Sequence, residues 1–210
     1  ELSVTVGEHE VHLLGYGFDP AHEGLRAHLA RFAEARRDRA RRMVERLQAV
    51  GVPIALEDVR QAADGAAALG RPHVAAALVA GGHVASYDEA FERYLRYDRP
   101  GFVGKPPFPA DDALDLLHDA GGIGVLAHPG HWTSGRTLHL LRRAGLDGIE
   151  VHHPSHDASL TEYYARLAHD ATLVPTGGSD YHGHGPDDEA RFGAYGLSRS
   201  AWRRVDEAIR

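Results

Sequence analysis

The stretch Gly177-Gly178-Ser179-Asp180-Tyr181-His182-Gly183 follows directly on the apolar run of residues 172–176, which the pattern predicts to be a short buried strand. The glycines on both sides allow sharp turns and a close approach of the backbone to another group. Asp180 and His182 are two residues apart, so on an extended backbone we expect both side chains to point to the same side. A carboxylate beside an imidazole is a pair of donors that divalent metals accept. The stretch therefore predicts part of a metal site at the end of a strand.

A second stretch of the same kind lies upstream, where the apolar run Gly124-Val125-Leu126-Ala127 ends in His128-Pro129-Gly130. Between and around the two stretches, helical and strand patterns alternate. We expect helices over residues 110–120, 135–144 and 158–169 and from about 199, and strands over 123–127, 148–152 and 172–176. This alternation predicts an α/β fold with a parallel sheet or barrel, in which ligands from several strands meet at the carboxyl ends.

The first half of the chain has a different pattern. Residues 2–6 and 10–16 are apolar or alternating around Gly7-Glu8, which predicts a hairpin. Helical periodicity then covers residues 21–50, 56–67, the segment from Gly70 to Val79, and 87–95. We therefore divide the chain into an α/β domain of residues 1–19 and 101–210 and an all-helical insertion of residues 20–100. The first of these helices carries an arginine-rich face, which fits either a solvated surface or a phosphate-facing patch: Arg36, Arg37, Arg39, Arg41, Arg42 and Arg46.

The composition narrows the possible functions. The 210 residues contain no cysteine, so disulfides and thiolate metal sites are excluded and any metal must be held by histidine, aspartate or glutamate. A formal net charge of −7 argues against a protein that coats nucleic acid. No apolar run approaches the roughly 20 residues that span a bilayer, so we expect a cytoplasmic protein without a membrane partner. Sixteen histidines cluster near the ends of predicted strands.

The candidate metal ligands are the acidic and histidine residues at strand ends or beside glycines: Glu1, His12, His128, Asp180 and His182. We interpret His152, His153 and His156 as supporting or surface groups rather than ligands. With these residues in view, the chain resembles the PHP (polymerase and histidinol phosphatase) phosphoesterases, closest to the branch that hydrolyses 3′,5′-nucleoside bisphosphates and trims short RNA from the 5′ end. The matching stretches include Glu1-Leu2-Ser3, His12-Leu13-Leu14-Gly15-Tyr16, Gly70-Arg71-Pro72-His73, Ala127-His128-Pro129-Gly130 and Gly178-Ser179-Asp180-Tyr181-His182-Gly183.

The resemblance implies a distorted (β/α)7 barrel with two or three divalent ions at its carboxyl rim, Mn²⁺ foremost and Zn²⁺, Fe²⁺ or Mg²⁺ as alternatives. It places Glu1, His12, His128, Asp180 and His182 among the metal ligands. It also assigns contacts with the substrate to Arg71 and His73 on the helical insertion. The implied partner is a phosphorylated nucleotide or short RNA, hydrolysed by metal-activated water, with no obligate protein partner.

One feature of the family is missing from the chain. PHP proteins open with a His-x-His strand and a further Asp and His before the glutamate, whereas this chain begins at Glu1. We therefore expect an N-terminally truncated barrel with part of the ligand set. Two other functions stay open at this point, a phosphatase for a small metabolite such as histidinol phosphate and a non-catalytic metal-binding fragment.

Overall fold

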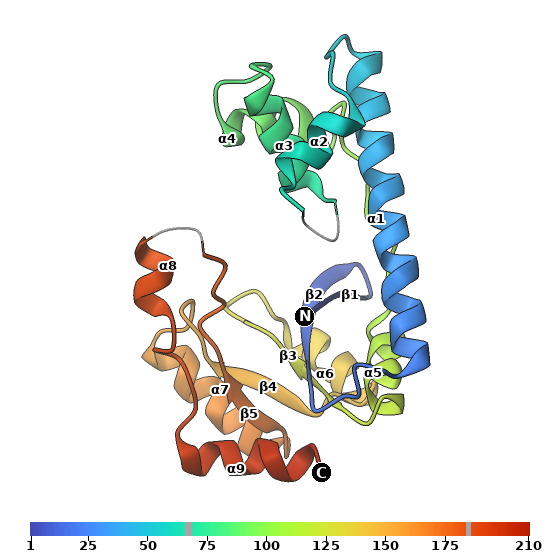
Figure 1. Cartoon of the computed structure of the whole chain (residues 1–210). Helices are drawn as coiled ribbons and strands as arrows, with labels where there is room; N and C mark the ends of the chain where they lie inside the picture. The colour runs from blue at the N-terminus through green and yellow to red at the C-terminus, as the bar shows by residue number, and fades with distance from the viewer. Residues whose placement is uncertain (66–68, 184–185) are drawn as a thin grey trace. The chain divides into compact units, whose positions relative to one another are not determined.

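A computed structural model describes residues 1–65, 69–183 and 186–210 of the chain (Figure 1). The chain divides into two compact units. We call them the sheet unit, which comprises Glu1–Leu25 and Pro107–Arg210, and the helical unit, which comprises Arg26–Pro106. None of the helices among the described residues is both long and apolar enough to cross a membrane.

The described residues of the sheet unit form five strands in the order β1-β2-β3-β4-β5 (Figure 1): β1 (Leu2–Val6), β2 (His9–Tyr16), β3 (Ile123–Leu126), β4 (Gly148–His152) and β5 (Val174–Gly177). Strands β1 and β2 form the expected hairpin, and Gly7 takes the left-handed conformation that its turn requires (φ 62°). Strand β2 also pairs antiparallel with β3, whereas β3, β4 and β5 are parallel. The parallel sheet predicted from the alternating pattern is therefore confirmed for the second half of the unit, and the hairpin extends it in antiparallel fashion.

In the part of the sheet unit that the structure describes, these strands are accompanied by α5 (Ala110–Asp119), α6 (Gly135–Arg143), α7 (Ala158–Asp170), α8 (Pro186–Arg191) and α9 (Arg199–Ala208). Helix α5 packs against β1 and β3, α7 against β4, and α9 against β5. Short polar side chains begin three of the helices, because the side chains of Ser134, Asp157 and Ser198 each accept a hydrogen bond from a backbone N–H of the first turn. Apolar side chains from the strands and from the helices fill the core of the sheet unit, among them Leu13, Leu114, Leu126, Leu141 and Ile149, all at most 1% exposed.

The helical unit holds most of α1 (Glu23–Ala49), together with α2 (Leu56–Ala62), α3 (Arg71–Ala80), α4 (Tyr87–Ala90) and a π-helical turn η1 (Phe91–Leu95). It has its own core, which includes Met43, Leu47, Ile54 and Leu78, each at most 2% exposed. Arg39 is part of this interior: it is 4% exposed, and its Nε donates to the carbonyl of Val103 at 2.8 Å. The assignment of Arg39 to a single arginine-rich outer face was therefore wrong.

The remaining differences from the sequence-based boundaries have local causes. Helix α2 ends at Ala62 rather than continuing to residue 67, because Asp64 and Gly65 adopt left-handed conformations (φ 42° and 80°). Residues 66 and 67 of that predicted helix lie outside the described residues. Strand β5 begins at Val174 rather than at Thr172, whose left-handed backbone (φ 57°) does not fit a strand.

Candidate metal centre

Strand register brings Glu1, His12 and His128 together at the carboxyl end of β3. In the hairpin, Ser3 lies opposite His12, so Glu1 at the start of the chain comes close to the same point. Because β2 runs antiparallel to β3, His12 in the interior of β2 lies beside the end of β3, and its carbonyl accepts the N–H of Ala127 at 3.0 Å. His128 is the next residue. His12 therefore reaches this edge from inside a strand whose direction is reversed, and not from a strand end.

These three side chains form a compact set of donors. His12 Nδ1 lies 2.5 Å from Glu1 Oε1 and 3.1 Å from His128 Nε2, and His128 Nε2 lies 3.5 Å from the same carboxylate oxygen. Each residue has one potential metal-ligand atom that lies within 4.8 Å of the corresponding atoms of the other two. A carboxylate with two imidazoles is a ligand set that suits Zn²⁺, Mn²⁺ or Fe²⁺, and three protein ligands leave coordination positions open for water or substrate. The residues present therefore fit a divalent ion.

The charges at this cluster reinforce one another. Hydrogen bonds from His12 and then His128 hold the pKa of the Glu1 carboxyl well below its usual range. The hydrogen bond with Glu1 in turn raises the pKa of His128, against the opposing effect of burial. The carboxylate is thus ionised at neutral pH, as a metal ligand must be.

Glu150 of β4 contacts the backbone of His128 and is 3% exposed. Its Oε2 accepts the backbone N–H of His128 at 2.7 Å, and His128 itself has an unusual positive φ of 28°. Burial raises the pKa of Glu150 to about 7. Gly178 leaves room for this carboxylate, since a Cβ there would lie 2.9 Å from Oε1. Glu150 therefore fixes the backbone from which His128 projects.

A second support acts two residues further on, at Gly130. His156 Nε2 accepts the N–H of Gly130 at 3.1 Å, and its Nδ1 donates to the carbonyl of Val151 at 2.9 Å. The hydroxyl of Tyr164, on α7, donates to the carbonyl of Gly130 at 2.6 Å. His156 is 8% and Tyr164 1% exposed, so the loop after His128 is held by two buried side chains. Sequence reasoning missed Tyr164, although its helical spacing from Leu160 marks it as a residue that faces the core.

Asp180 and His182 lie in the same region but outside the three-residue cluster. Both line a cavity of about 260 Å³ whose wall also includes Glu1, His128 and Glu150. The backbone at Asp180 is left-handed (φ 49°) and not extended as expected, but the two side chains do lie together, with His182 Nδ1 3.6 Å from Asp180 Oδ1. His182 Nδ1 also lies 2.7 Å from the carbonyl oxygen of Asp180.

Arg71 and His73 begin helix α3 of the helical unit. The Arg71 guanidinium lies 6.0 Å from the ring centre of Phe91 and 5.6 Å from that of Phe102, distances typical of cation–π contacts. His73 Nδ1 accepts the N–H of Gly70 at 3.1 Å, so its proton is on Nε2 in the neutral ring. Both side chains keep polar groups that could bind an anion, and their role stays a prediction.

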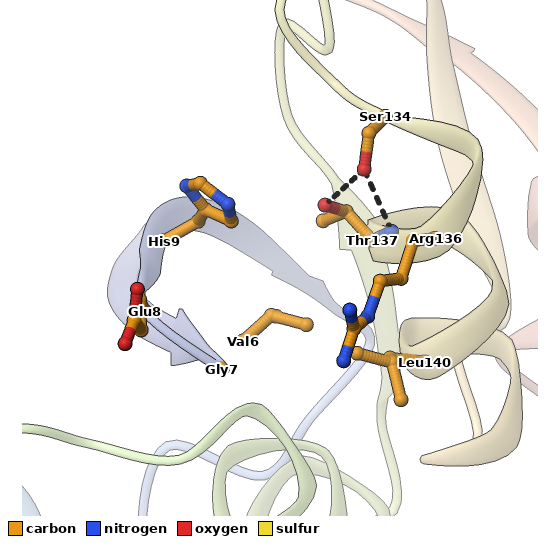
Figure 2. A pocket seen from close by; sticks show the side chains of 8 residues that line it. All are labelled: Val6, Gly7, Glu8, His9, Ser134, Arg136, Thr137 and Leu140. Carbon is orange, nitrogen blue, oxygen red and sulfur yellow. Dashed lines mark hydrogen bonds between the residues drawn. The ribbon is translucent and has the colours of Figure 1, made fainter.

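A larger cavity of about 390 Å³ lies at the turn of the hairpin, away from the cluster (Figure 2). Its lining includes Glu8, His9 and Arg136, and Figure 2 shows the Ser134 hydroxyl bonded to Thr137. These contacts explain the start of α6. Among the described residues the only group of three or more donors close enough to share a metal is the Glu1–His12–His128 cluster, so the cluster is the better candidate site.

Proteins of similar sequence are hydrolases of phosphate esters, which is consistent with a metal centre at the Glu1–His12–His128 cluster. A 3′,5′-nucleoside bisphosphate phosphatase from Chromobacterium violaceum is 36% identical over 217 residues, which span 100% of this chain and 76% of that protein. A 5′-3′ exoribonuclease Rnm from Salmonella typhimurium is 33% identical over 188 residues, 87% of this chain but 64% of the relative. The chain thus spans less than two thirds of the exoribonuclease. No protein-family model matches the chain.

Two solved structures have the same fold. A protein from Bifidobacterium adolescentis assigned as a metal-dependent phosphoesterase matches with a TM-score of 0.80 and 30% identity, over 98% of this chain and 74% of that one. An amidohydrolase from Chromobacterium violaceum with bound sulfate matches with a TM-score of 0.74 and 32% identity, over the same shares. The cluster of a glutamate and two histidines and these similarities, which cover at least 98% of this chain and about three quarters of each of these relatives, lead to one conclusion: the chain belongs to the PHP family of metal-dependent phosphoesterases.

Proposed function

We propose that the chain hydrolyses phosphate monoesters of nucleotides, with 3′,5′-nucleoside bisphosphates as the substrate class. The observation that carries the proposal is the Glu1–His12–His128 cluster, at a cavity wall that also holds Asp180 and His182, in a chain 36% identical to a bisphosphate phosphatase. Divalent ions at such a centre lower the pKa of water and neutralise the charge of phosphoryl oxygens. We propose two or three ions, with Mn²⁺ foremost, and Asp180 and His182 as further ligands.

The chain's own residues divide the remaining tasks. Glu1, His12 and His128 bring their ligand atoms within 4.8 Å of one another, while Glu150 fixes the backbone of His128 by accepting its N–H. The cavity, at about 260 Å³, is smaller than the roughly 300–1,000 Å³ of pockets that enclose a drug-sized ligand. We therefore expect it to take the phosphoryl group, while the nucleoside stays outside it.

Arg71 and His73 are our proposed phosphate-binding residues on the helical unit. The guanidinium offers a planar pair of donors that matches two phosphate oxygens, a geometry that lysine does not reproduce. In the neutral ring the Nε2–H of His73 is a donor while Nδ1 accepts the N–H of Gly70. Their contribution would be to orient the substrate or, for His73, to protonate the leaving oxygen.

A second candidate activity is the removal of nucleotides from the 5′ end of short RNA. It is favoured by the 33% identity to the Salmonella exoribonuclease, of which this chain spans 64%. Both reactions hydrolyse a phosphate ester, so one metal centre could serve both.

The proposal is tested by phosphate release from adenosine 3′,5′-bisphosphate in the presence of Mn²⁺, in parallel with a 5′-phosphorylated RNA trinucleotide and histidinol phosphate. We expect turnover of the bisphosphate and none of histidinol phosphate. His12→Gln should lower kcat/KM by at least about 100-fold, because a metal ion contributes several kcal/mol to the transition state. His9→Gln is the matched control, since His9 lies in the same strand at the distant cavity, and its activity should stay within about twofold.

Two results would overturn the proposal. One is hydrolysis of the bisphosphate that does not change in the His12→Gln variant. The other is a preference for histidinol phosphate, which would assign the site to small metabolites.

A further inference from the structure

His153 is a buried histidine whose proton can be assigned from its contacts. It follows β4 directly and is 6% exposed. The backbone N–H of Ser155 donates to its Nδ1 at 3.1 Å, and the hydroxyl oxygen of Ser155 lies 2.8 Å from the same nitrogen. A ring nitrogen that accepts an N–H carries no proton itself, so in the neutral ring the proton is on Nε2. This Nε2–H is buried and has no hydrogen-bond partner among the described residues.

A carboxylate lies close to this N–H. Asp180 Oδ2 is 3.8 Å from His153 Nε2, about 1 Å more than in a charge-assisted hydrogen bond. The Asp180 side chain is 37% exposed and has room to turn, whereas the ring of His153 is fixed by Ser155. Native proteins rarely leave a buried N–H without an acceptor. A small rotation of the Asp180 carboxylate would supply one.

The two oxygens of Asp180 have different neighbours. Oδ2 lies toward His153, whereas Oδ1 lies 3.6 Å from Nδ1 of His182. A hydrogen bond from His153 to Oδ2 would therefore fix the carboxylate and leave Oδ1 available to a cation. Carboxylates that ligate metals are commonly held by such hydrogen bonds from groups that do not touch the metal. The ring centres of His153 and His128 are 5.5 Å apart, so this contact adjoins the metal centre.

We propose that His153 is a positioning residue, whose Nε2–H donates to Oδ2 of Asp180 and holds that carboxylate in place for a cation of the metal centre. His153 is not itself a ligand, because its nitrogen nearest to Asp180 carries the proton. The inference rests on the proposed function in one respect, namely that Asp180 is a metal ligand. It narrows our sequence-based interpretation of His153 as a supporting or surface group to a stated atom and a stated partner.

The test is the affinity for Zn²⁺, measured by competition with a chromophoric chelator. Loss of a group that orients a ligand weakens metal binding by about 10–100-fold, and we expect a loss of this size in His153→Phe, which keeps a ring but no donor. His153→Gln should bind Zn²⁺ within about threefold of the unsubstituted chain, because its amide N–H can replace Nε2–H. His152→Phe is the matched control, because His152 is the exposed neighbour at the end of β4, and its affinity should stay within about twofold.

Two further measurements examine whether His153 acts through Asp180. In an Asp180→Ala background, His153→Phe should weaken Zn²⁺ binding by no more than about a further twofold, because the carboxylate that His153 positions is absent. In the metal-free chain, nitrogen NMR spectroscopy of the imidazole rings should show His153 protonated at Nε2. The NMR measurement uses the unsubstituted chain, so it stays decisive if His153→Phe does not fold.

Three results would overturn the proposal and leave the proposed function standing. One is an NMR spectrum that places the proton of His153 on Nδ1. Another is an unchanged Zn²⁺ affinity in His153→Phe. The third is an equal loss of affinity with and without Asp180, because His153 would then act on the fold in general. If the unsubstituted chain binds no Zn²⁺, the metal centre of the proposed function fails and the inference fails with it.

Discussion

Replacing Tyr164 by phenylalanine removes one buried hydroxyl from the support behind His128. That hydroxyl donates to the carbonyl of Gly130 at 2.6 Å, and Tyr164 is 1% exposed. Burial raises the pKa of Tyr164 to about 12, so the hydroxyl keeps its proton throughout the pH range of the assay. The substitution leaves the packing of the ring intact but deprives a buried carbonyl of its donor.

The expected cost follows from that loss. Removing one partner from a buried hydrogen bond destabilises a protein by about 1–3 kcal/mol. For a domain of this size, that corresponds to a decrease in Tm of roughly 3–10 °C. Because Gly130 is two residues from His128, we also expect Zn²⁺ to bind about tenfold more weakly, as is typical when a group that orients a ligand is lost.

The assay compares thermal melting and Zn²⁺ affinity for Tyr164→Phe and Tyr163→Phe. Tyr163 is the adjacent residue on the same helix and is 48% exposed, so its variant should melt within about 1 °C of the unsubstituted chain. If both variants melt alike and bind Zn²⁺ alike, Tyr164 does not hold the His128 loop and our reasoning about the support is refuted.

Three further predictions concern neighbouring groups. Gly178→Ala should destabilise the chain by about 1–3 kcal/mol, because the new Cβ would lie 2.9 Å from a Glu150 carboxylate oxygen. Gly135→Ala, whose Cβ would have open space around it, should not destabilise the chain. Urea unfolding compares the two variants, and equal stability would contradict the close contact at Gly178. In EDTA, Glu150→Gln should gain stability relative to the unsubstituted chain as the pH rises from about 4.5 to above 7, by up to about 3 kcal/mol. The reason is that folding raises the pKa of the Glu150 carboxyl, so this group stabilises the fold only while it is protonated. A difference in Tm between the two proteins that does not change with pH would refute this. Arg71→Lys should raise KM for the bisphosphate about tenfold and leave Zn²⁺ affinity unchanged, since lysine lacks the planar pair of donors, and steady-state kinetics with an unchanged KM would remove Arg71 from the substrate site.

Much of the sheet unit could be predicted because its signals are local. The apolar run before His128 and the turn at Gly7 each reflect a few consecutive residues, and β3 and the β1–β2 hairpin lie where these signals placed them. The convergence of Glu1, His12 and His128 was expected from resemblance to a family. Its physical cause is the antiparallel pairing of β2 with β3, which no single stretch of sequence specifies.

The missed features depend on contacts between distant residues. Tyr164 supports the loop after His128 only because α7 packs against β4, which brings Tyr164 to a carbonyl 34 residues away, whereas His156 was expected as a supporting or surface group and is a supporting one. The burial of His153 likewise follows from tertiary packing. The left-handed backbone of Asp180 was missed for a different reason, since the Asp-x-His spacing does not specify the backbone conformation; the two side chains nevertheless lie 3.6 Å apart.

The most direct measurement of the central claim is an anomalous difference map from crystals of the chain soaked in Zn²⁺, recorded at the zinc absorption edge. We expect a peak about 2.0–2.2 Å from one carboxylate oxygen of Glu1, one ring nitrogen of His12 and Nε2 of His128. A map with no peak among these three side chains, or with zinc bound only elsewhere on the molecule, would contradict the metal centre.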